Sequence, residues 1–135
     1  MSENDLSFLF VIPIKEGRGQ WAFPKQLKEN LFQNSVRVRG LYTKEKAYPD
    51  KFLFAISNVS EHSGLGKSVI TNVLAIFNFP KGNLFQSNGA YVTAPINIIP
   101  SDIKFTITDD SFDRVKDFEG WIYVELMGHK KRNIE

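Results

Sequence analysis

The sequence predicts an all-β protein, a single jelly-roll β-sandwich of about seven or eight antiparallel strands with at most one short helix. Two observations support this fold class. Apolar and polar residues alternate along several short runs, which is the pattern of a strand with one face in a core. Clusters of Gly, Pro, Asn and Asp separate these runs and favour turns. No repeat or linker divides the 135 residues, so we expect one domain spanning 1–135, with flexible tails at 1–5 and 128–135.

The C-terminal third carries the clearest strands. In the first, apolar residues alternate with residues of a solvated face: Ile103, Phe105 and Ile107 against Lys104, Thr106 and Thr108. In the second, Ile122, Val124 and Leu126 form one face, and Trp121, Tyr123, Glu125 and Met127 form the other. Between them lie an acidic turn, the apolar pair Val115 and Phe118, and a glycine at the entrance of the second strand.

The preceding residues supply further strands and one segment with helical spacing. Strands are expected at 6–14, 35–43, 52–59, 69–79 and 91–99, and a short helix or irregular crossover at 21–31. In the strand at 35–43, strict alternation places Val36, Val38 and Gly40 on one face and Arg37, Arg39 and Leu41 on the other.

The strand at 52–59 is apolar on both of its faces, because Phe52, Phe54 and Ile56 oppose Leu53, Ala55 and Val59. A two-sheet sandwich buries one face of each strand, so a loop or a neighbouring subunit must cover the other. The chain also has more aromatic residues than a small sandwich core readily holds: Phe8, Phe10, Trp21, Phe23, Phe32, Phe77, Phe79 and Phe85. Some of them could lie at a subunit interface, where aromatic residues are enriched, and the alternative is a Phe-rich core. We therefore expect a homo-oligomer with an aromatic interface.

The composition excludes several function classes. The chain has no Cys, and therefore no disulfide framework, thiolate metal site or Cys nucleophile. A net charge of +2 is too small to indicate nucleic-acid binding by itself. The apolar run at 6–14 follows acidic residues and is far shorter than the ~20 residues of a membrane span, so we expect no signal peptide and no membrane contact.

Several motifs are better explained structurally than chemically. The Gly64–Ser68 stretch, GLGKS, lacks the first glycine of a phosphate loop, whose place Glu61 takes. The two histidines, His62 and His129, have no partner at metal-ligand spacing. The acidic residues around Asp109 lack the spacing of a calcium loop. We thus expect no enzyme activity, no cofactor and no metal.

Arg37 and Arg39 share one strand face and could contact phosphate or an acidic partner. They could equally protect the solvated face of an edge strand from aggregation. The basic tail Lys130, Lys131 and Arg132 allows weak, non-specific contact with nucleic acid.

From Phe52 to Met127 the chain resembles the jelly-roll capsid-type proteins of polinton-like elements, adintoviruses and related double-stranded DNA viruses. The resemblance is carried by KFLFAISNVSEHSGLG, then VLAIFNF, then the strand at 103–107, the turn from Asp109 to Val115, and Phe118-Glu119-Gly120 before the last strand. It favours a jelly roll over an immunoglobulin-like strand order. It implies a structural capsid or penton-like component that assembles as a trimer or pentamer, with other capsid proteins as further partners. The expected location is the virion, or the cytoplasm or nucleus of the host cell.

The alternative function is that of a ligand-binding β-sandwich such as a carbohydrate-binding module, with Trp21, Tyr42 or Trp121 stacked on a sugar. For the assembly function, the sequence nominates six interface residues: Arg37, Arg39, Phe52, Phe54, Trp21 and Trp121.

Overall fold

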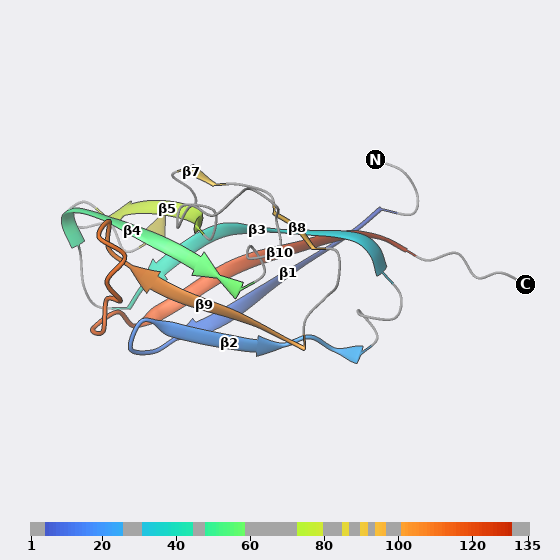
Figure 1. Cartoon of the computed structure of the whole chain (residues 1–135), viewed down its shortest axis with the longest axis horizontal. Coiled ribbons are helices and arrows are strands. Elements are labelled where there is room, and N and C mark those ends of the chain that lie inside the picture. The colour runs from blue at the N-terminus through green and yellow to red at the C-terminus, as the bar shows by residue number, and fades with distance from the viewer. Residues whose placement is uncertain are drawn as a thin grey trace, which may run out of the picture.

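The chain forms two antiparallel β-sheets packed face to face (Figure 1). The computed structural model describes residues 5–25, 31–44, 48–58, 73–79, 85–86, 90–91, 94–96 and 101–130. Sheet A has the order β1 (Asp5–Ile14), β10 (Gly120–Lys130), β3 (Leu31–Thr43) and β6 (Phe85–Gln86), and β8 (Ala94–Ile96) also pairs with β3. Sheet B has the order β2 (Arg18–Ala22), β9 (Asp102–Thr108), β4 (Tyr48–Ser57), β5 (Val73–Phe79) and β7 (Ala90–Tyr91).

This strand order is that of a jelly roll. The first and last strands, β1 and β10, are neighbours in sheet A, while β2 and β9 are neighbours in sheet B. β3 then lies beside β10, and β4 lies beside β9, so the chain winds from one sheet to the other as a rolled-up hairpin. The described residues form ten strands rather than seven or eight because β6, β7 and β8 are short pieces of two or three residues.

The bounds expected for a short helix or irregular crossover, 21–31, are too wide at both ends. Trp21 belongs to β2, and Leu31 begins β3. Residues 26–30 between them lie outside the described part of the chain. The leucine spacing that suggested a helix therefore extends into a strand, where tertiary packing decides the conformation. No helix among the described residues is long and apolar enough to cross a membrane.

A two-residue turn joins β1 to β2 and passes the chain from sheet A to sheet B. Its central residues, Glu16 and Gly17, both have positive φ, 54° and 76°. Lys15 and Arg18 exchange two backbone hydrogen bonds of 2.9 and 3.0 Å across it. These features define the type I′ hairpin turn, which favours glycine because L-residues tolerate positive φ poorly.

The core lies between the inner faces of the two sheets. The expected inward faces of β9 and β10 are confirmed, since each of these residues is at most 1% exposed: Ile103, Phe105, Ile107, Ile122, Val124 and Leu126. The expectation for Thr108 was wrong, because its side chain was expected on the solvated face and the residue is only 4% exposed. Its hydroxyl donates to the Asp109 carbonyl at 3.0 Å, which satisfies the buried polar group.

The predicted faces of β3 are correct as far as Arg39 and wrong for Gly40 and Leu41. The pairing of β3 with β10 shifts by one residue there: Val38 lies opposite Val124, and Gly40 lies opposite Tyr123. This bulge reverses the alternation, so Leu41 points into the core and is fully buried. The boundaries of the tails also differ, because β1 begins at Asp5 and β10 continues to Lys130.

Candidate functional site

Aromatic side chains gather on the outer face of sheet A. The register places Val11 of β1 opposite Tyr123 of β10, and Trp121 of β10 opposite Tyr42 of β3. These four side chains line a shallow, open hollow of about 340 Å³. The Tyr42 and Trp121 rings lie 5.1 Å apart, tilted by 44°. A hollow of this kind can accept a flat apolar surface and has polar tyrosine and indole groups at its edge.

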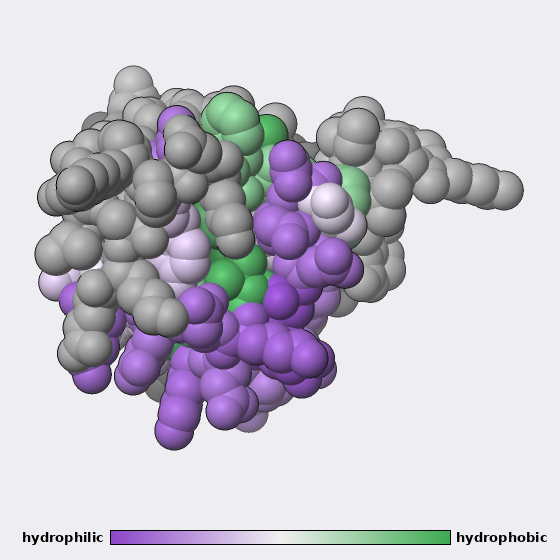
Figure 2. Space-filling model, turned by 90° about the vertical axis from the view of Figure 1, so that its left-hand side faces the viewer, coloured by the Kyte–Doolittle hydropathy of each residue, from purple (hydrophilic) through white to green (hydrophobic). Residues whose placement is uncertain are grey.

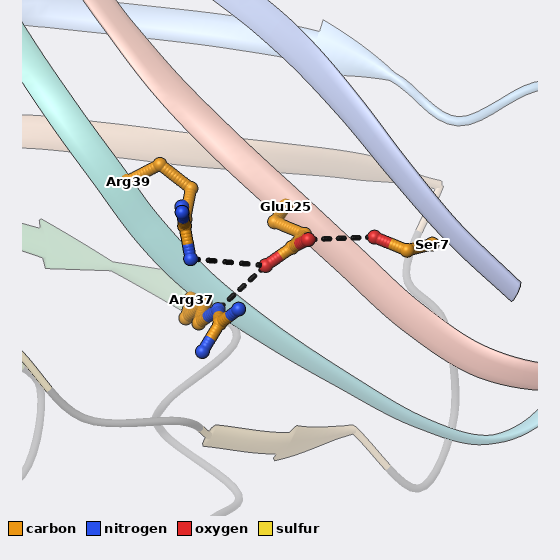
Figure 3. A network of polar contacts seen from close by, with 4 residues as sticks. All are labelled: Ser7, Arg37, Arg39 and Glu125. Atoms are coloured by element: carbon orange, nitrogen blue, oxygen red, sulfur yellow. Dashed lines mark hydrogen bonds and ion pairs between the residues drawn. The ribbon is translucent and has the colours of Figure 1, made fainter. Parts of the chain in front are cut away.

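A polar network crosses the same face of sheet A (Figure 3). Glu125 of β10 accepts a hydrogen bond of 2.6 Å from the Ser7 hydroxyl on β1. On the other side it accepts a bond of 2.5 Å from Arg37 Nε, and Arg39 Nη1 lies 3.8 Å away. The two arginines expected to share a face therefore do so. Their strand, β3, has neighbours on both sides, so it is not the edge strand that the protective explanation required.

Glu125 and Tyr48 have perturbed pKa values with different causes. Partial burial raises the pKa of Glu125, but the hydrogen bonds from Ser7 and Arg37 and the charges of both arginines outweigh it, so the pKa lies below its ordinary value. For Tyr48, burial and then the charge of Asp117 raise the pKa to about 12. The Tyr48 ring stacks on Phe118, with ring centres 5.8 Å apart, so this tyrosine is a core residue.

Three large apolar side chains are exposed among the described residues: Leu9 by 64%, Val11 by 41% and Phe52 by 53%. Leu9 and Val11 lie on β1, at the edge of sheet A, and Phe52 lies on β4 of sheet B. The sequence nominated Phe52 but missed Leu9 and Val11. The signal was present, because the strand at 6–14 is apolar on both faces in the same way as the strand at 52–59.

The loop after β9 covers part of the outer face of β4. Asp109 Oδ1 accepts hydrogen bonds from the backbone amides of Ser111 and Asp113, at 2.9 and 3.0 Å. The turn holds Phe112 at φ 64°, and its ring packs edge-on against Phe54 at 5.5 Å. Figure 2 shows this end of the molecule, where hydrophilic residues lie to the right of and below a hydrophobic strip. Phe54 is therefore covered within the chain, whereas Phe52 is not.

The described residues of the aromatic surplus pack in or against the core. Phe77 and Phe23 belong to the buried core. Trp21 stacks on Phe10 at 4.0 Å, and both pack against the core together with Phe8. Trp21 is thus poorly placed to stack on a ligand, unlike Tyr42 and Trp121. The side chains of Phe32, Phe79 and Phe85 lie outside the described part of the structure.

The remaining motifs are placed as follows. The acidic residues around Asp109 form a turn in which its carboxylate binds backbone amides, and the described residues contain no group of three metal-binding side chains. Asn58, just after β4, donates to the Asp102 carbonyl at 3.1 Å and accepts from the Lys104 amide at 2.9 Å. His129 lies on β10. The phosphate-loop-like stretch, His62 and the last tail residues lie outside the described part of the chain.

No protein-family model and no curated protein matches the sequence. One solved structure to which the chain is similar is the NLP core of Drosophila, whose crystal structure was described for insight into pentamer formation and histone binding. The two share 8% identity over 95% of this chain and 99% of that chain, with a TM-score of 0.42. At this level the likeness does not bear on what this chain binds or assembles with.

Proposed function

We propose that the chain is a structural jelly-roll protein that assembles with copies of itself, as a capsid or penton-like component of a double-stranded DNA virus or a virus-derived element. The observation that carries the proposal is the exposure of Leu9, Val11 and Phe52. Burying one such side chain fully stabilises a contact by about 1.5–3 kcal/mol. The jelly-roll strand order and the resemblance of the segment from Phe52 to Met127 to capsid-type proteins agree with this function.

The exposed residues lie on two different sheets, which matters for the kind of assembly. Leu9 and Val11 lie on the outer face of sheet A, and Phe52 lies on sheet B. A chain with one apolar patch can form a dimer and stop. A chain with two separate patches can contact two or more neighbours, which rings and closed shells require.

Light scattering at micromolar concentration tests the proposal. We expect a mass that is a multiple of 15.4 kDa, and rings or shells by negative-stain electron microscopy. A single species of 15.4 kDa at all concentrations would overturn the self-assembly. A stable oligomer that forms neither rings nor shells would remove the capsid function.

A second candidate is supported by the aromatic hollow. Tyr42 and Trp121, two of the three residues that the sequence nominated for sugar stacking, lie side by side in it, with Tyr123 next to them. The Glu125 carboxylate and the half-exposed Arg39 lie on the same sheet face and could bind sugar hydroxyls.

Tryptophan fluorescence distinguishes this candidate from the first. The chain has two tryptophans, and Trp21 lies against the core, so an oligosaccharide in the hollow would change mainly the emission of Trp121. Saturable binding of neutral hexose oligosaccharides, lost in Trp121→Ala and retained in Lys104→Ala on the opposite sheet, would support a carbohydrate-binding module. Unchanged emission at millimolar oligosaccharide would reject it.

A further inference from the structure

The edge of β1 has backbone hydrogen-bonding groups that a strand of a partner could pair with. Sheet A ends at β1, which pairs with β10 on one side and with no other strand among the described residues on its other side. The N–H and C=O groups of an edge strand attract another strand unless charges, prolines or a bulge prevent it. Residues 6–12 contain no charged residue and no proline.

The hydrogen-bonding groups that face this edge can be assigned. Lys15 directs its N–H and C=O groups to Arg18 in β2, away from β10. Successive residues of a strand direct these groups to opposite sides, so Leu9 and Val11, which have the same parity as Lys15, also face away from β10. Pro13 has that parity too, which fits the placement of proline with its missing N–H toward a free edge.

The free part of the edge is bounded at one end. Near Pro13, β2 lies close to β1, because a Cβ on Gly19 would lie 2.7 Å from the Pro13 carbonyl oxygen. A partner strand therefore has access to the residues before Pro13. Leu9 is central in this part and is the most exposed large apolar side chain among the described residues, at 64%.

We propose that β1 pairs antiparallel with β1 of a second copy, with Leu9 opposite Leu9 on a two-fold axis. This inference rests on the proposed self-assembly and names the contact that would produce it. In this register Ser7 of each copy lies opposite Val11 of the other, and residues 7, 9 and 11 exchange backbone hydrogen bonds. The two sheets A join into one continuous sheet, and each Leu9 covers its equivalent.

A second copy suits this edge better than an unrelated strand does. A two-fold contact needs a self-complementary surface, and a short uncharged strand brings no like charges together. Glu125 lies opposite Leu9 in β10, but Arg37 and Arg39 balance its charge within the same chain. The contact has two-fold symmetry, so it leaves Phe52 on sheet B for a different contact.

Cysteine cross-linking tests the register cleanly, because the chain has no Cys of its own. Residues in a hydrogen-bonded antiparallel pair have Cα atoms about 5.5 Å apart, which a disulfide can bridge. We expect Leu9→Cys to form a covalent dimer under mild oxidation at micromolar concentration. Ser7→Cys and Val11→Cys should each stay monomeric on a non-reducing gel, since their equivalents would lie about 13 Å apart. An equimolar mixture of these two variants should cross-link.

The outcomes separate this inference from the function on which it rests. All three positions are exposed, so the substitutions leave the core intact. If wild-type protein has an oligomeric mass but Leu9→Cys gives no covalent dimer, the contact is wrong and the self-assembly stands. Equal cross-linking of the three single variants would also overturn the register, because it indicates random collision. A monomeric wild type without cross-links would reject both proposals, for instance because a segment of the same chain covers the edge.

Discussion

Gly120, the first residue of β10, occupies a position where the structure leaves no room for a side chain. A Cβ atom at this position would lie 1.8 Å from the Tyr42 carbonyl oxygen and 2.9 Å from the carbonyl carbon. Both atoms belong to the backbone of β3, which cannot move without disturbing its pairing with β10. We expect Gly120→Ala to lower the free energy of unfolding by about 2–3 kcal/mol, measured by chemical denaturation.

The neighbouring residue supplies the control for this prediction. Glu119 is exposed and lies just before the strand, so Glu119→Ala should change the free energy of unfolding by less than about 0.5 kcal/mol. Equal stability of Gly120→Ala and wild type would mean that β3 and β10 are less closely packed than the structure indicates.

Glu125 gives the protein a predictable dependence on pH. Its pKa is lower in the folded chain than in the unfolded chain, so its stabilising contribution is present above the unfolded pKa. The contribution is lost as the pH falls through the folded pKa. Because the side chain is 18% exposed and near the surface, solvent screening limits the effect of Glu125→Gln to about 1 kcal/mol at pH 7.

Denaturation of wild type and Glu125→Gln at pH 7 and near pH 3 measures this dependence. The difference in the free energy of unfolding should be present at pH 7 and shrink toward acidic pH, as the Glu125 carboxylate takes up a proton in the folded chain. Glu119→Gln is the matched control, because its contact with Lys44 is longer, 3.6 Å, and both side chains are about half exposed. A difference for Glu125→Gln that does not change with pH would exclude the electrostatic explanation.

At the scale of single elements, the inward face of a strand can be predicted when the residues of that strand alone determine it. The inward faces of β9 and β10 followed from simple alternation, and the structure confirms them. The face of Leu41 did not, because the bulge beside Tyr123 arises from the pairing of β3 with β10 and leaves no mark in the alternation. The bounds of the expected helix were wrong for a similar reason, because leucine spacing alone does not distinguish a helix from a strand.

The loop after β9 makes a testable contribution to the cover of β4. Asp109→Ala removes the acceptor for two backbone amides and should lower the free energy of unfolding by about 1–2 kcal/mol. Asp109→Asn keeps an acceptor oxygen and should retain most of the stability. Hydrogen exchange gives a local measurement, because the Val115 amide, bonded to the Ile107 carbonyl at 2.9 Å, should exchange faster in Asp109→Ala.

Asp110 is the control for this loop. It is exposed at the next position, and Asp110→Ala removes the same charge without removing the acceptor. If both alanine variants had the same effect, the loop would be stabilised by charge rather than by the turn.

At the scale of the whole molecule, the site depends on strands that are distant in sequence. The sequence nominated Tyr42 and Trp121 separately, but it gave no reason to expect them in one hollow. The complete hollow, which includes Val11, requires β10 to lie between β1 and β3, and this order is a property of the jelly roll as a whole. The exposure of Leu9, in contrast, had a signal in the sequence, because the strand at 6–14 is apolar on both faces.

The exposed Phe52 tests whether the assembly uses a second surface in addition to β1. Phe52→Ser removes a large apolar side chain that is 53% exposed, so about half of it is buried within one chain and we expect the free energy of unfolding to fall by about 1 kcal/mol. If Phe52 lies in a contact between copies, the substitution should weaken that contact at least about tenfold, corresponding to 1.4 kcal/mol. Sedimentation velocity over a range of concentrations measures this weakening.

Asn78→Ser is the matched control, because Asn78 is exposed and lies opposite Phe52 on the neighbouring strand. With two separate contacts, Phe52→Ser should reduce the large assembly to the dimer that the β1 contact holds together, while Asn78→Ser keeps the wild-type mass. If Phe52→Ser also keeps the wild-type mass at every concentration, Phe52 is outside any contact. The shell proposed here would then lack its second contact, and one two-fold contact alone cannot build a shell.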